Sequence, residues 1–433
     1  MSPPPRRARG GVRTIGRALA HRNYRLFFTG QSISLIGAWL TRVATSWLVY
    51  RLTHSAWMLG IVGFAGQFPT FLLAPIAGVW VDRWNRHRVL VVTQVLAAVQ
   101  SGLLAYLALR GIITIPHVVA LSILQGVINA LDMPARQSFV VDMIGNNRED
   151  LPNAIALNSS MFNGARLIGP SVAGILIAWV GEGWCFFIDA VSYLAVIASL
   201  LMMKVALSER PRREGSVVRE IREGYRYIAG FTPIRSVLFL LALVSLLGFP
   251  YTVLMPIMAA QVLHGGPHTL GFLMAASGVG ALTGALYLAS RSSVLGLGSL
   301  IARSAAGFGV GLVLFSLSRN VWLSMALMAI CGLTMILQMA ASNTVIQTLV
   351  DDDKRGRVMS FYSMAFFGTA PLGSLFAGTV ATWIGVPRTI LVGGAACVLA
   401  ALGFWKALPH IRRAARPVYV RLGILPAPTE QSL

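Results

Sequence analysis

One short polar segment holds residues suited to a contact between helices. It reads GVWVDRWNRHR over residues 78–88, between two long apolar runs. Gly78 and Asp82 mark a place where a helix ends and turns sharply, and Asp82 can then meet the positive end of another helix dipole. Three basic residues follow the acid, namely Arg83, Arg86 and Arg88. We expect a contact with another helix here, although a basic loop that only orients the preceding helix is the alternative.

A few charged residues lie inside apolar runs, where they are costly and therefore candidates for function. Arg42 and Arg166 are well inside their runs, and Asp189 is about a turn and a half into its own. Asp189 either titrates after desolvation or stays ionised beside Arg42 or Arg166. Arg303 is close to the end of its run, where a long side chain can reach water.

Polar residues also recur at helical spacing in three apolar runs, which places them on one face of each helix. Such a stripe either lines a polar space or forms hydrogen bonds between helices. The stripes comprise Gln31, Ser34, Arg42 and Thr45 in the first run, Gln125, Asn129, Asp132 and Arg136 in the fourth, and Thr334, Gln338 and Ser342 in the tenth.

The apolar runs themselves exclude a soluble protein. Hydrophobic residues make up 56% of the 433-residue chain and charged residues only 12%. This is close to what twelve membrane spans of about twenty residues require. We expect the spans at residues 26–50, 57–81, 89–109, 115–134, 153–180, 184–204, 236–260, 268–290, 297–318, 321–346, 358–384 and 386–408.

The basic residues are segregated between alternate polar segments. The net charge of +21 would indicate a nucleic-acid partner in a soluble chain. Here the loops on one side hold only four of the basic residues, Arg51, Arg110, Arg319 and Arg388. The positive-inside rule places both termini in the cytoplasm and the protein in the cytoplasmic (inner) membrane as a multi-pass protein. The charge then indicates attraction to anionic lipid rather than to nucleic acid.

The chain contains an internal repeat. Residues 169–181 align without a gap on residues 373–385, which indicates two related halves. We expect an N-terminal tail at 1–25, a first six-helix bundle at 26–204, a linker with an amphipathic helix at 205–235, a second bundle at 236–408 and a C-terminal tail at 409–433.

The segment at 78–88 resembles the loop signature of the major facilitator superfamily. Asn85 stands where the signature has its second glycine, and asparagine also tolerates positive φ. The resemblance extends over about residues 23–408. Further motifs are similar to the branch that contains the enterobactin exporter and macrolide-efflux (transmembrane secretion effector) relatives; they lie at residues 47–53, 132–138, 163–170 and 355–360.

This resemblance implies an all-α membrane protein with twelve transmembrane helices in two pseudo-symmetric six-helix bundles. It implies that Asp82 meets the start of the eleventh helix near Val358 and that Arg86 reaches Asp132 on the fourth helix. The expected latch therefore comprises Gly78, Asp82, Arg83, Arg86, Arg88 and Asp132. The expected substrate cavity comprises Gln31, Ser34, Arg42, Thr45, Gln125, Asn129, Arg166, Thr334, Gln338 and Ser342.

The fifth span also partly matches the antiporter motif of the superfamily. Gly169, Pro170 and Gly174 fit that motif, whereas Ala165 and Ala173 stand where glycine is usual. Small residues let two helices approach closely, and proline stiffens or kinks the span. The segment is therefore expected to act as a hinge or seal between the halves. The alternative is packing of small residues without a role in coupling.

We expect a secondary active transporter that exports a small amphipathic compound, siderophore-like or drug-like, in exchange for protons by alternating access. Asp189 and Asp132 are the candidates for proton coupling. Uptake or facilitated diffusion is the alternative, and a channel or receptor is a more distant one. We expect a monomer that is not an enzyme and has no cofactor. A metal site is not expected, since His264 and His268 have no acid or cysteine nearby. An ATP-driven pump is not expected either, since no lysine follows a phosphate-binding loop.

Overall fold

The structure is a computed structural model that describes residues 16–144, 148–203, 217–291, 293–351 and 354–426. These residues are almost all helical, and no strand occurs among them. Twelve helices or series of helices in this part of the chain are long and apolar enough to cross a membrane. The predicted all-α membrane fold is therefore confirmed.

The first six crossings are single helices, and the bounds of all helices are as follows. The first half contains η2 (Arg17–Ala20), α1 (Arg22–Thr53), α2 (Ala56–Arg83), α3 (Arg86–Leu109), α4 (Ile115–Ile144), η3 (Arg148–Asp150), α5 (Leu151–Val180) and α6 (Glu182–Leu201). The remainder contains α7 (Val217–Gly230), α8 (Thr232–Leu243), η4 (Val244–Gly248), α9 (Tyr251–Ile257), η5 (Met258–Val262), α10 (Pro267–Ala289), α11 (Leu297–Leu317), α12 (Val321–Leu349), α13 (Arg355–Ser363), η6 (Met364–Gly368), α14 (Thr369–Ile384) and α15 (Val386–Arg421).

The seventh and eleventh crossings are interrupted by wide π-helical turns. In the seventh, η4 and η5 flank α9, and in the eleventh, η6 joins α13 to α14. Pro250 follows η4 and Pro371 follows η6 closely. Proline lacks an N–H group and clashes with the turn before it, so the preceding turn widens while the chain stays helical.

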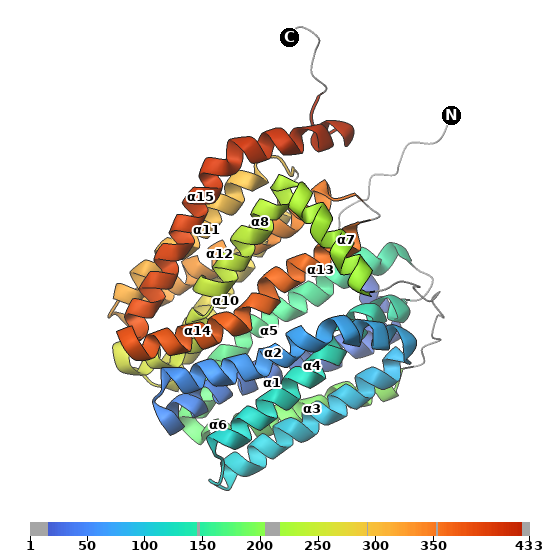
Figure 1. The fold of residues 1–433 in the computed structure, drawn as a ribbon. Helices are drawn as coiled ribbons and strands as arrows, with labels where there is room; N and C mark the ends of the chain where they lie inside the picture. Colours follow the sequence, from blue (N-terminus) through green and yellow to red (C-terminus); the bar gives the residue numbers. More distant parts are fainter. Residues whose placement is uncertain (1–15, 145–147, 204–216, 292, 352–353, 427–433) are drawn as a thin grey trace.

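The two halves lie side by side, blue to green and yellow to red in Figure 1. Within the first half, α1 packs against α5 and α6, and α4 packs against α2 and α3. Within the second half, α12 packs against α10 and α11, and α15 packs against α11 and α8. The main contacts between the halves are α5 with α10 and α2 with α14, so four helices form most of the interface.

At this interface the backbones approach each other at two equivalent places. A Cβ atom on Gly174 of α5 would lie 2.8 Å from the carbonyl oxygen of Pro267 and 3.0 Å from the Cα of Gly271 on α10. A Cβ atom on Gly378 of α14 would lie 2.9 Å from the Cα of Gly60 on α2. Gly174 and Gly378 occupy the same position in the repeat. The two contacts are therefore related by the pseudo-two-fold symmetry that the repeat predicts.

Several predicted boundaries differ from those of the helices. The α4 helix continues to Ile144, ten residues beyond the predicted end of the fourth span. The α15 helix continues to Arg421 and so enters the predicted C-terminal tail. The α7 helix lies inside the predicted linker, while residues 1–15 of the predicted N-terminal tail and 204–216 lie outside the described residues.

An ion pair holds the extended end of α15 against the end of α12. Arg421 donates a hydrogen bond from Nη2 to Oδ1 of Asp351 at 2.8 Å, and Lys354 lies on the other side of this carboxylate. The hydrogen bond from Arg421 is the main cause that lowers the pKa of the exposed Asp351 carboxyl below its usual value. Asp351 therefore stays charged at neutral pH, and its own positive partners neutralise it.

Equivalent glycines end α5 and α14, and they allow a test of the repeat. Gly181 has φ 86° and ψ 172°, and Gly385 has φ 83° and ψ 156°. Only glycine adopts this region without strain, so we expect Gly181→Ala and Gly385→Ala each to lower the free energy of unfolding by about 1–3 kcal/mol. The two losses should add, because the sites are far apart in the repeat. Equilibrium unfolding in mixed micelles measures these losses.

The matched control is Gly403→Ala within α15, where an added Cβ would meet open space and the helix prefers alanine. This substitution should be neutral or slightly stabilising. A similar loss in all three variants would show that the backbone conformation at residues 181 and 385 is not the cause.

Candidate functional site

Two arginines from the first half lie near the interface in the middle of the bundle. Arg42 of α1 is exposed although it lies deep within the protein, and its guanidinium group stacks 4.7 Å from the ring centre of Trp39. Arg166 of α5 is half-buried and lies within electrostatic range of Arg42. Within the described part of the chain, neither arginine has an acidic partner. The two charges therefore border an accessible space inside the protein.

The second half approaches this space through the seventh and eighth crossings. A Cβ atom on Gly278 of α10 would lie 3.1 Å from the carbonyl oxygen of Arg166, so α10 passes directly over that turn of α5. Tyr251 of α9 is buried, and its hydroxyl lies 3.4 Å from the hydroxyl of Ser277 on α10. Sequence reasoning did not identify Tyr251 or Trp39. Trp39 could have been found from its spacing, because residues three apart on one helix are neighbours and it lies three residues before Arg42. The place of Tyr251 beside α10 depends on packing between helices, which no spacing in the chain reports.

The other predicted cavity residues fall into two groups. Thr45, Gln125, Asn129 and Thr334 are partly accessible, and Gln125 donates a hydrogen bond to Asn129 at 3.0 Å. In this conformation the remainder are buried and line no accessible space. They are Gln31, Ser34, Gln338 and Ser342, which are exposed by 2% or less.

Helix packing explains why part of the first stripe is buried. Gly30 and Gly37 of α1 approach α6 closely, since a Cβ atom on either would lie 2.5 Å from a serine hydroxyl of that helix. Ser34 lies between these glycines on the same helical face. The polar stripe of α1 is therefore divided, with one part facing α6 and another part, at Arg42, facing the space between the halves.

Asp189 of α6 lies in the first of these two environments. It is 1% exposed, and its Oδ2 atom accepts hydrogen bonds from Thr41 of α1 and Ser101 of α3, both at 2.7 Å. Its Oδ1 atom has no hydrogen-bond partner. Of the two alternatives for Asp189, an ion pair with Arg42 or Arg166 is therefore wrong, because the carboxylate is hydrogen-bonded to hydroxyl groups of α1 and α3 instead.

The predicted contact between Arg86 and Asp132 is also wrong. Arg86, at the start of α3, pairs with Asp142 near the end of α4, where Nη1 lies 3.1 Å from Oδ2 and both side chains are buried. Asp132 instead pairs with Arg136 and accepts hydrogen bonds from Thr93 and Gln94 of α3. Ten helical residues separate the two acids, about 15 Å along α4, and an arginine at the start of α3 reaches only the acid nearer to it, Asp142.

The rest of the predicted latch is described only in part. Gly78, Asp82 and Arg83 belong to the last turns of α2, but the surroundings of their side chains lie outside the described part, so their latch role and the contact near Val358 stay predictions. Arg88 is exposed. Asn85 has φ −66° and accepts a hydrogen bond from the N–H of Arg88 at 3.1 Å. Asparagine therefore stands at this position because it caps α3, and the expected positive φ does not occur.

The contact between the halves is limited along its length. In antiparallel register, α5 and α10 meet at Gly174 with Gly271 and again at Leu167 with Gly278. Gly60 of α2 and Gly378 of α14 make the equivalent close contact. These close contacts between the halves all lie in the parts of the helices away from the chain ends. Arg166 is adjacent to Leu167, at the end of the α5–α10 contacts nearest the chain ends.

Metal ligation has no support in the described residues, among which no group of three or more His, Cys, Asp or Glu side chains could hold an ion. The three cysteines are buried and unpaired. The groups that can do chemistry here are thus two cations facing an accessible space and one buried carboxyl one helix away.

Comparisons with known proteins identify relatives of this architecture. The sequence model of a family described as transmembrane secretion effector matches residues 17–418. The staphyloferrin A transporter of Staphylococcus aureus is 25% identical over 380 residues, which are 88% of this chain and 94% of the relative. The multidrug efflux pump Tap of Mycolicibacterium fortuitum is 28% identical over 363 residues, covering 82% of this chain and 88% of that pump. The crystal structure of the nucleoside transporter NupG has the same fold, with a TM-score of 0.69 at 12% identity over 90% of this chain and 99% of that one.

The pairing of Arg86 can be tested with a double-mutant cycle. We expect Arg86→Gln and Asp142→Asn to show a coupling energy of about 1–3 kcal/mol in equilibrium unfolding, because each single change removes one member of a buried ion pair. The cycle of Arg86→Gln with Asp132→Asn serves as the control and should show coupling below about 0.5 kcal/mol. The opposite order of the two coupling energies would restore Asp132 as the partner.

Proposed function

We propose that this chain exports a small amphipathic anion in exchange for protons. It belongs to the transmembrane secretion effector family of the major facilitator superfamily, whose members are secondary transporters. The cargo is siderophore-like or drug-like. The two relatives described above are named for staphyloferrin A and for multidrug efflux, and both names support this class of cargo.

The pair of arginines at the interface carries this proposal. Two guanidinium groups without acidic partners repel each other and are costly to hold in the middle of a membrane. An anion that enters between them removes this repulsion, and guanidinium binds oxygen anions with two parallel hydrogen bonds. Trp39, stacked on Arg42, offers an aromatic surface to the apolar part of the same molecule. A cation would meet repulsion at this place.

We propose that the cavity opens to the cytoplasm in this conformation. The basic residues concentrate on the side of the chain ends, and the positive-inside rule then places both termini in the cytoplasm. The close contacts between the halves, such as Gly174 with Gly271 and Gly60 with Gly378, lie toward the opposite side. Closure there, with separation of the glycine contacts on the opposite side, would move the cargo outward. The latch formed by the 78–88 segment and the eleventh crossing would hold the closed state.

We assign proton coupling to Asp189 and a structural role to Asp132. Asp132 has a cationic partner and two hydrogen-bond donors, so its charge is compensated. Asp189 has only hydroxyl partners, and burial without a counter-ion penalises its charged form. Thr41, which donates to Asp189, is adjacent to Arg42 in α1. A change of protonation at Asp189 would therefore alter the support of the helix that presents the cargo-binding arginine.

Transport by everted membrane vesicles tests the cargo class. With a pH gradient, vesicles should accumulate carboxyfluorescein more than a cationic rhodamine dye, and Arg42→Gln or Arg166→Gln should lower the initial rate about tenfold or more, since each removes a charged hydrogen-bonding group. Arg303→Gln is the matched control, because Arg303 is exposed near the start of α11 and bonds only its own helix. Preferential accumulation of the cation, or equal losses in all three variants, would contradict an anionic cargo.

The same vesicles separate export from the alternatives. Uptake as the natural direction, or facilitated diffusion, would show no accumulation driven by the pH gradient in everted vesicles. A channel would show no acceleration of labelled dye by unlabelled dye on the opposite side.

Asp189→Asn tests the coupling. We expect accumulation in a pH gradient to fall to the level seen without a gradient, because an amide cannot carry the proton, while exchange of labelled for unlabelled cargo continues. Asp351→Asn, which changes an exposed carboxyl outside the spans, should retain accumulation. Full gradient-driven accumulation by Asp189→Asn would remove this residue from the coupling mechanism.

A further inference from the structure

A separate cavity lies entirely within the second half, on the side of the chain ends. Its volume is about 300 Å³, at the lower end of the range of small-molecule pockets. Four elements form it: the second turn of α8, the segment that leads into α11, the last turns of α12 and the C-terminal part of α15. Three of these helices begin or end here, so the cavity lies at the level where they leave the membrane.

The inner wall of this cavity is apolar. Its buried lining includes Val237, Val345, Leu349, Phe404 and Leu408, and these come from three different helices. Such a wall attracts hydrocarbon and offers nothing to a small hydrophilic ion.

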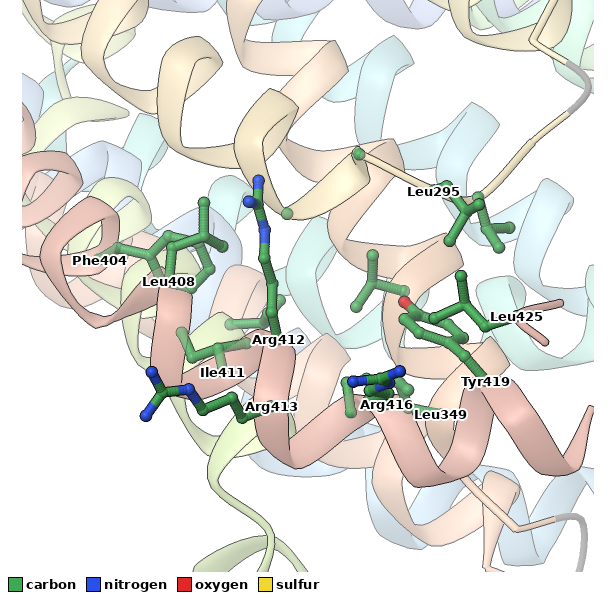
Figure 2. A pocket seen from close by; sticks show the side chains of 16 residues that line it. Leu295, Leu349, Phe404, Leu408, Ile411, Arg412, Arg413, Arg416, Tyr419 and Leu425 are labelled. Atoms are coloured by element: carbon green, nitrogen blue, oxygen red, sulfur yellow. The ribbon is translucent and has the colours of Figure 1, made fainter. Parts of the chain in front are cut away.

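The rim of the cavity is basic and has no acidic residue. Arg412, Arg413 and Arg416 of α15 are exposed, and they form no hydrogen bond or ion pair within the described residues. Figure 2 shows Arg412 extending from α15 toward the neighbouring helix, with Arg416 further along the same helix beside Tyr419. The hydroxyl of Tyr419 likewise has no hydrogen-bond partner in the described part of the chain. Asp351, the nearby acid, is already neutralised by Arg421 and Lys354.

The shape of α15 places this rim at the surface of the membrane. Figure 1 shows the helix bending before its C-terminal part. Pro409 lies within the helix and cannot donate a backbone hydrogen bond to the preceding turn, which accounts for the bend. Beyond it, Ile411 and Ala415 are buried while the arginines are exposed. A helix that is apolar on one side and basic on the other lies in the interface plane.

We propose that this cavity binds an anionic phospholipid. One acyl chain enters the apolar space between α8, α12 and α15, and the phosphodiester accepts hydrogen bonds from Arg412, Arg416 and Tyr419. The combination of a hydrocarbon-sized apolar wall with an uncompensated cationic rim at membrane level fits an amphipathic anion supplied by the bilayer. A soluble phosphate would use only the rim. The bound lipid would hold the end of α15 against α11 and α12.

Native mass spectrometry of the purified full-length protein tests this site. In micelles doped with phosphatidylglycerol, we expect a bound lipid, and we expect phosphatidylcholine of the same chain length to bind far less. Arg412→Gln/Arg416→Gln should weaken apparent binding of phosphatidylglycerol by up to about thirty-fold, as expected for two basic residues near a membrane surface. Both residues are exposed, so the variant should fold, and its unfolding in mixed micelles checks this.

The matched control is Arg22→Gln/Arg25→Gln, which removes the same charge from exposed residues at the start of α1 on the same side of the bundle. This variant should retain binding. An equal loss in the control, equal binding of phosphatidylcholine, or displacement of the lipid by millimolar sn-glycerol 3-phosphate would each overturn the proposal. The last result would show that a soluble phosphate occupies the site. Because no cargo-binding residue is changed, failure here leaves the proposed transport function intact.

Discussion

The cost of placing a guanidinium group in hydrocarbon is the constraint on which the rest of this structure depends. Arg42 and Arg166 lie deep in a twelve-helix bundle without acidic partners, so they are tolerable only if they face a hydrated space. That space requires the two halves to stand apart there, while the protein must remain sealed elsewhere. The division into two bundles, the accessible face of α1 and the limited length of the interface all follow from this requirement.

The seal is made by backbone rather than by side chains. At Gly174 with Gly271 and at Gly60 with Gly378, two helices approach so closely that an added methyl group would meet the partner helix. Such contacts gain dispersion energy without polar groups to satisfy, which suits a joint that has to open and close in a membrane. Ion pairs between described residues, in contrast, lie within one half or join α7 to the second half.

The buried carboxylates in the interior of the first half differ in how their negative charge is compensated. Asp132 and Asp142 each have a cationic partner, whereas Asp189 has two hydroxyl donors. Replacing a counter-ion by hydroxyls leaves the charged form undercompensated, which is a usual arrangement for groups that exchange protons. The carboxyl of Asp189 links α1, α3 and α6, so its protonation state affects the contacts among these three helices.

The sequence alone determined the fold class, the twelve crossings and the two-fold repeat, because hydropathy over twenty residues and the recurrence of small residues are properties of the local chain. It also singled out Arg42, Arg166 and Asp189, since a charge in an apolar run is visible without coordinates. Tertiary structure alone decided which of these groups meet. Asp142 replaced Asp132 as the partner of Arg86 because α4 extends ten residues further than its apolar run, and Gln338 and Ser342 are buried because the orientation of α12 turns them inward. Pairings of this kind depend on the rotation and register of one helix against another, which are fixed by the packing of side chains far apart in the chain.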